Sequence, residues 1–129
     1  MESKVILIGE EPYWFKFGLK GLIYLAENLN IEKEMNKYKI CYAGLLANYP
    51  EIQMAEVFKF PLDESFMKSI GEIFSASTLP SPQTIEEWFK KGIGEMGLPL
   101  STFYCLTPLE LDLAYDGYLR RWELMANLV

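Results

Sequence analysis

The spacing of apolar and polar positions changes along the chain, and it predicts a β-hairpin at the start. Residues 5–8 form a short β-branched and apolar run, and residues 13–17 alternate aromatic with other side chains. Between them, residues 9–12 read Gly-Glu-Glu-Pro, which is typical of a turn. Two short strands joined by a turn are therefore expected before the first helix.

Helical spacing follows the hairpin directly. In residues 18–29 and again in residues 33–48, apolar side chains recur at helical intervals and form one wide face. The second helix is expected to end before the Tyr49-Pro50 pair, because the residue before a proline avoids the α region. Residues 52–60 fit either a short helix or an extended stretch.

The second half of the chain carries clearer helix starts. Asp63 is a candidate N-cap for a helix over residues 64–75. A proline-containing stretch ends that helix, and Thr84 then begins a pattern that fits a capping box. Thr107 begins a second capping box and has proline after it, at the first helical position.

A long amphipathic helix is predicted for the end of the chain. Charged and polar side chains alternate there with a stripe of apolar ones at helical spacing. The stripe consists of Leu111, Tyr115, Tyr118, Trp122 and Met125.

Together these segments predict an α+β fold that is predominantly α-helical, with a small N-terminal β-hairpin followed by about five helices. A single domain over residues 1–129 is expected, since 129 residues with 50% apolar composition suffice for one ordinary core. Within it, an N-terminal hairpin and helical part, 1–76, and a C-terminal helical part, 84–129, are joined by a Pro-containing linker, 77–83.

Charge and cysteine content narrow the possible partners and the compartment. The formal charge of −6 disfavours nucleic acid and anionic membranes, and no segment approaches the roughly 20 apolar residues of a membrane span. The acidic, briefly apolar N-terminus does not fit a signal peptide. Cys41 and Cys105 lie in aromatic-rich stretches, where cysteine usually acts as a small buried hydrophobe. A cytoplasmic protein without a disulfide is expected.

Candidate chemistry is sparse. The chain has no histidine, and its two cysteines are far apart, so catalytic triads and common zinc sites are disfavoured. Gly92, Gly94 and Gly97 match a dinucleotide-binding spacing, but they follow a predicted helix instead of a strand, and a helix C-cap is favoured. The acidic pairs are interpreted as solvated charges. We expect no catalytic residues, no metal and no cofactor.

Large aromatic and thioether side chains are the most informative feature. Tyr13, Trp14, Phe15 and Phe17 place rings on both faces of one short strand, so they are either core on both sides or partly an interface. The six methionines either fill gaps in the core or line an adaptable groove for apolar helices. They are Met1, Met35, Met54, Met67, Met96 and Met125.

Two long stretches together resemble the tail assembly chaperones of siphophages, including phages of Gram-positive hosts such as lactococci. Residues 5–31 contain a short strand, a turn, an aromatic strand and a helix with a leucine-rich face. Residues 85–123 contain a tryptophan helix, a Gly/Pro loop, the L-T-P-x-E motif and a helix with G-Y-x-x-R. The middle, about residues 50–80, is not anchored by the resemblance.

The resemblance implies a mainly helical fold and a role without catalysis. Such a chaperone binds the long, apolar, helical tape-measure protein in the host cell cytoplasm, keeps it soluble until tail-tube polymerisation, and is not retained in the mature virion. It also implies a homo-oligomer, a ring or spiral, and leaves open a longer frameshifted product. Protein-binding candidates on the surface are Tyr13, Trp14, Phe15, Trp88, Phe89, Phe103, Tyr115, Tyr118 and Trp122.

Two alternatives stay open beside the chaperone. The first is a structural virion protein, such as a tail-completion or connector subunit, since small acidic helical proteins of this kind also form rings. The second is an enzyme that uses carboxylates and a metal ion.

Overall fold

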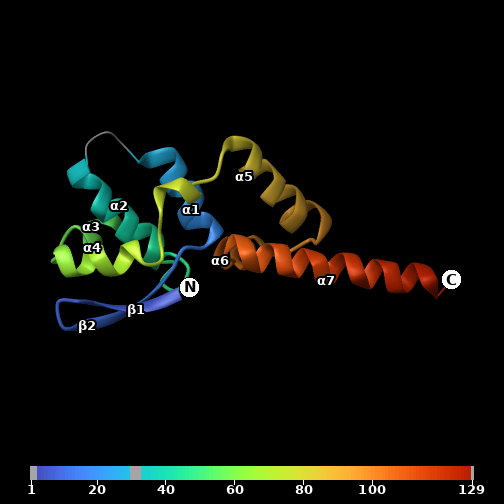
Figure 1. Ribbon diagram of the computed structural model, residues 1–129, viewed down its shortest axis with the longest axis horizontal. Coiled ribbons are helices and arrows are strands. Elements are labelled where there is room, and N and C mark those ends of the chain that lie inside the picture. Colours follow the sequence, from blue (N-terminus) through green and yellow to red (C-terminus); the bar gives the residue numbers. More distant parts are fainter. Residues whose placement is uncertain (1–2, 30–32, 129) are drawn as a thin grey trace.

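The computed structural model describes residues 3–29 and 33–128 (Figure 1). A two-stranded antiparallel hairpin is followed by helices, so the mostly helical α+β fold predicted from the sequence is confirmed. The elements are β1 (Ser3–Ile8), β2 (Glu11–Lys16), α1 (Leu19–Asn28), α2 (Lys33–Leu45), α3 (Met54–Val57), α4 (Glu64–Gly71), the 3-10 helix η1 (Ala76–Thr78), α5 (Pro82–Phe89), the π-helix η2 (Lys90–Glu95), α6 (Leu100–Cys105) and α7 (Pro108–Asn127).

Seven α-helices are present in residues 3–29 and 33–128, against about five expected. The short helices α3 and α6, of 4 and 6 residues, account for the difference. Residues 52–60, whose sequence fits either a short helix or an extended stretch, contain α3. Helices of four to six residues are too short to show a clear helical periodicity in the sequence. Tertiary packing stabilises such short helices.

The hairpin separates its two faces by the alternation of its side chains. Ile6 and Ile8 of β1 and Phe15 of β2 are buried, whereas Val5 and Trp14, which pair across the strands, are exposed. One face therefore joins the core and the other faces solvent. The turn is shorter than expected: only Gly9 and Glu10 form it, with Gly9 at φ 64, and the predicted turn residues Glu11 and Pro12 belong to β2.

The helices α1 and α2 lie against each other at unusually close range. A Cβ atom on Gly21 of α1 would lie 2.4 Å from the carbonyl oxygen of Ala43 in α2. The start of α1 is also fixed to the C-terminal half of the chain, because the Leu19 amide donates to the Leu106 carbonyl at 2.7 Å. The helix α2 ends at Leu45, three residues before the expected end, and turns lead from there to Tyr49.

Two predicted helix boundaries around the linker need correction. Asp63 caps α4 as expected, but α4 ends at Gly71 instead of about residue 75. The cap of α5 is Ser81, not Thr84, because the Ser81 side chain accepts from the Thr84 amide at 3.1 Å and proline follows Ser81 at the first helical position. The predicted linker over 77–83 therefore contains the end of η1 and the start of α5.

The glycine-rich stretch ends a helix, as the C-cap interpretation proposed. After η2, Gly97 takes φ 66 and the Leu98 amide donates back to the Gly92 carbonyl at 2.9 Å. Gly92 serves close packing, since a Cβ atom there would lie 2.4 Å from Cδ1 of Phe103. The spacing that resembled a dinucleotide motif thus arises from a helix end and a tight ring contact.

The capping box predicted for the last helix is confirmed. The Thr107 amide donates to Oε1 of Glu110 at 2.9 Å, and the Glu110 amide donates to Oγ1 of Thr107 at 3.1 Å. Lys16 of the hairpin pairs with Glu110 at 2.7 Å and joins the two ends of the chain. In Figure 1, α7 starts beside the body and then extends away from it toward the C-terminus.

Candidate protein-binding site

The first half of α7 is fastened to the body by a few specific contacts. Leu111 is fully buried, and α7 packs mainly against η2. Nζ of Lys91 lies 3.8 Å from Asp112 and 5.3 Å from the centroid of the Tyr115 ring. A hydrogen bond with Glu95 raises the pKa of Tyr115. These contacts hold α7 in the direction seen in Figure 1.

Residues 116–128, which we call the α7 extension, carry large apolar side chains in solvent. Trp122 is 56% exposed, Leu124 is 65% exposed and Met125 is 55% exposed. Leu119 and Leu128 are exposed as well. Large exposed apolar patches are rare on soluble monomers, and where they occur they usually mark interaction sites.

One side of the α7 extension forms an aromatic strip. The rings of Tyr118 and Trp122 are 6.2 Å apart at 79°, and Tyr115 stacks beside Tyr118 at 6.1 Å. A hollow of about 180 Å³ is lined by Tyr118, Arg121, Trp122 and Met125. The sequence stripe is therefore a real geometric strip, but Leu111 is its one buried member.

A second apolar row on α7 was missed in the sequence. Leu113, Leu124 and Leu128 are exposed, and their separations of 11 and 4 residues place them on one helix face, apart from the aromatic strip. The sequence does contain a signal for this row, because these leucines lie outside the predicted apolar stripe, where an amphipathic helix would have polar residues. A helix with apolar groups on more than one face is usually covered by another element.

Three candidate residues are contradicted as surface positions. Phe15 and Phe103 are fully buried and Trp88 is 8% exposed. Phe15 lies on the inner face of β2, with its ring 5.6 Å from that of Phe66, and Phe103 lies under Gly92. They were wrong as surface positions because sequence periodicity identifies a large ring without showing which face of its element is covered.

The other candidates lie at three separate places. Phe89 is half-buried and packs on Phe103 at 4.8 Å. Tyr13 and Trp14 are on β2, where Trp14 points outward and is 54% exposed. Tyr115, Tyr118 and Trp122 are on α7. The structure thus brings together only this last group as one strip.

The methionines divide between the two interpretations. Partly buried against the core are Met54, Met67 and Met96, as gap fillers would be. Met35 and Met125 are exposed, and Met1 lies outside the described residues. Only Met125 contributes to the α7 extension.

The two cysteines have structural roles in the fold. Burial raises the pKa of the Cys41 thiol to about 12, so this cysteine behaves as a small apolar group at neutral pH. Cys41 and Cys105 are both free, and Sγ of Cys105 donates to the Ala47 carbonyl at 3.4 Å. Within residues 3–29 and 33–128, no group of three or more Asp, Glu, Cys or His side chains is arranged to hold a metal ion.

Comparison with protein-family models, with curated proteins and with solved structures finds no match for this chain. The fold and surface by themselves define a small, mostly helical α+β protein with a projecting C-terminal helix that exposes apolar side chains. In the part of the chain that the structure describes, no helix has both the length and the apolar composition needed to cross a membrane.

Proposed function

We propose that this protein is a phage tail assembly chaperone that binds apolar helical segments of the tape-measure protein and keeps them soluble until the tail tube polymerises. The observation that carries the proposal is the α7 extension, which presents uncovered apolar side chains on two faces of one projecting helix. The role is one of binding, without a catalytic step.

The chemistry of the α7 extension suits an amphipathic helical client. Helices recognise each other through apolar anchors at intervals of three and four, and Tyr118, Trp122 and Met125 have this spacing. Fully burying a side chain of this size stabilises a complex by roughly 1.5–3 kcal/mol. These side chains are already about half covered, so each contact contributes less than that, which favours release when tube subunits arrive.

Several copies acting together compensate for weak single contacts. Copies on one long client gain avidity, because each binding event after the first is effectively intramolecular. The proposed homo-oligomer, a ring or spiral in the host cytoplasm, provides such an array. The formal charge of −6 per copy helps to keep the loaded complex dispersed.

Co-expression with fragments of a tape-measure protein tests this function. The protein is expected to raise the soluble yield of the fragment several-fold, and Met125→Ser in the α7 extension should remove most of that gain, because Met125 is one of the proposed anchors and is 55% exposed. Leu100→Ser is the matched control, since Leu100 is 50% exposed on α6 and lies outside the α7 extension. Circular dichroism checks that both variants keep the fold.

Two outcomes would contradict the proposal. A fragment that is equally soluble without the protein, or equal effects of the two serine variants, would exclude the α7 extension as the client site. Mass spectrometry of purified virions adds a further test, because the protein should be absent from them. Its presence at fixed stoichiometry would favour a structural tail component.

A further inference from the structure

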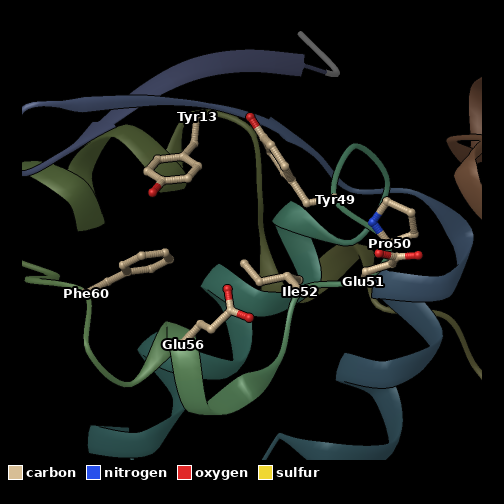
Figure 2. Close-up of a pocket in the computed structure, with 7 residues that line it drawn as sticks. All are labelled: Tyr13, Tyr49, Pro50, Glu51, Ile52, Glu56 and Phe60. Carbon is tan, nitrogen blue, oxygen red and sulfur yellow. The ribbon is translucent and has the colours of Figure 1, made fainter.

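A cavity of about 550 Å³ lies between β2 and the segment around α3 (Figure 2). In Figure 1, β2 and α3 are at the opposite end of the molecule from α7. Its walls are the rings of Tyr13, Tyr49 and Phe60, and Ile52 lies below Tyr49, across from Phe60. Glu51 and Glu56 contribute the charged side chains of the lining. We call this hollow the aromatic pocket.

The walls of the aromatic pocket are held in place by the fold. The Tyr13 ring lies 5.8 Å from Tyr49 at 68° and 5.4 Å from Phe60 at 49°. The hydroxyl of Tyr49 accepts from the Trp14 amide at 3.2 Å, and the Asn48 side chain donates to the Trp14 carbonyl at 3.3 Å. A ligand therefore meets rings that are already oriented.

Two carboxylates, those of Glu51 and Glu56, lie in the lining of the aromatic pocket. In Figure 2 the carboxylate of Glu56 points into the space between Phe60 and Ile52, below Tyr13, and Glu51 lies at the side of Pro50. Both glutamates are exposed, and neither takes part in a salt bridge with another residue of 3–29 or 33–128. An anionic ligand would be repelled, and a wholly apolar one would cover Glu56 without a partner.

We propose that the aromatic pocket accepts one basic side chain, arginine or lysine, from a polypeptide segment that is otherwise apolar. The methylene stem of such a side chain packs on Ile52 and the rings, and its charged end reaches Glu56. Ring faces attract a cation, and a carboxylate provides a charge-assisted hydrogen bond. The rings favour the apolar stem and the carboxylate favours the charged end. Only the two together select a side chain that has both.

The inference rests on the proposed function in one respect, since the polypeptide is taken to be the same client that the α7 extension binds. It specifies the chemistry of that client: an apolar helix with a basic residue. Because the two surfaces are separate, a variant of one leaves the other intact. Met125→Ser should therefore leave binding at the aromatic pocket unchanged, and failure of either proposal is visible by itself.

NMR titration of the full-length ¹⁵N-labelled protein tests the assignment. The probe is a blocked pentapeptide with arginine flanked by alanine and leucine, and its partner has citrulline, a neutral isostere, in place of arginine. The arginine peptide should shift the amides of Tyr13, Ile52 and Glu56, with an affinity about fivefold or more above that of the citrulline peptide. Glu56→Gln should weaken the arginine peptide about threefold to tenfold.

Glu87→Gln is the matched control, since Glu87 is exposed on α5 and does not line the pocket; it should leave the titration unchanged. Equal binding of the two peptides, or an equal effect of the two glutamine variants, would overturn the proposal. Tetramethylammonium producing the same shifts at lower concentration would assign the pocket to a small-molecule cation. If the same amide shifts appeared when only the protein concentration was raised, and the double variant Arg120→Gln/Arg121→Gln abolished them, the pocket would be assigned to a second copy of this chain.

Discussion

At the scale of single residues, small side chains fix how closely the helices approach. Gly21 and Gly92 have helical neighbours or rings where a Cβ atom would sit, whereas Gly71 and Gly117 have open space. The same residue type therefore has opposite consequences along the chain. The sequence does not distinguish closely packed glycines from those with open space around them, because the difference depends on which other segment packs against the glycine.

Gly21→Ala is predicted to destabilise the protein by about 1–3 kcal/mol, because the new methyl group would meet the Ala43 backbone, which cannot move aside without separating α1 from α2. Urea denaturation followed by circular dichroism measures the effect. Gly71→Ala is the control and should be neutral or stabilising by up to about 1 kcal/mol. Equal midpoints for wild type and Gly21→Ala would show that the helices are not packed this closely.

Glu110 makes one part of the stability dependent on pH. Partial burial by itself would raise the pKa of its carboxyl, but hydrogen bonds from Lys16 and Thr107 outweigh burial, and the pKa lies below its usual value of 4.5. A carboxylate with a lowered pKa stabilises the fold at neutral pH. That contribution is lost as the pH falls below the usual value and through the lowered one.

Glu110→Gln is accordingly predicted to lower the urea midpoint at pH 7, and the gap to wild type should close as the pH falls below the usual carboxyl pKa and through the lowered one. The measurement is a series of urea titrations across that range. Glu87→Gln, on an exposed surface of α5, should show no such gap at any pH. A constant gap for Glu110→Gln would assign its effect to lost packing instead of lost charge.

At the scale of elements, α7 is the exception among the helices. It has 20 residues and is about 30 Å long, but only Leu111 is buried. The capping box and the pairing of Glu110 with Lys16 fix its N-terminal end. Farther along, the helix depends on its own propensity, since few tertiary contacts support it.

Gly117→Ala is predicted to slow amide hydrogen exchange in residues 116–128 by about threefold to fivefold, while the urea midpoint of the body stays nearly unchanged. Alanine favours a helix interior over glycine by about 1 kcal/mol, and the site has open space for a methyl group. Hydrogen-exchange mass spectrometry resolves the segment. Unchanged exchange there would mean that α7 does not open locally in the way its sparse contacts suggest.

At the scale of the whole molecule, one buried cluster combines both halves of the chain. Ile6 and Phe15 from the hairpin share it with Trp88, Phe103 and Leu111 from the C-terminal part. The body is thus built from both ends of the sequence, and the two proposed binding features lie at different places on it. A client that contacts both the α7 extension and the aromatic pocket would span the body, which suits a long helical chain.

The sequence predicted the features that depend on neighbours in the chain. Alternation placed the hairpin, helical spacing placed α1 and α2, and the residues Asp63, Thr107 and Glu110 marked helix starts that the structure confirms. Capping works within a few residues, so these interactions are visible without a fold. Thr84 shows the limit, since two overlapping cap patterns compete there and Pro82 favours the earlier one.

Candidate binding residues were predicted less well, for a physical reason. Phe15 and Trp14 are adjacent in the chain, yet one is fully buried and the other is 54% exposed. Both are large rings on a strand, and only the packing of the hairpin on α2 and α4 decides which face is covered. The aromatic pocket likewise needs Tyr13 and Phe60 side by side, although 47 positions separate them in the sequence.

The sequence by itself determined the class of fold, the hairpin, most helix starts and the negative charge, because these follow from local periodicity, capping and composition. Only the tertiary structure decided which rings are buried, that Gly21 and Gly92 are contact points, and that α7 leaves the body with its apolar residues uncovered. Burial depends on which segments meet in space, and residues distant in the chain supply that contact.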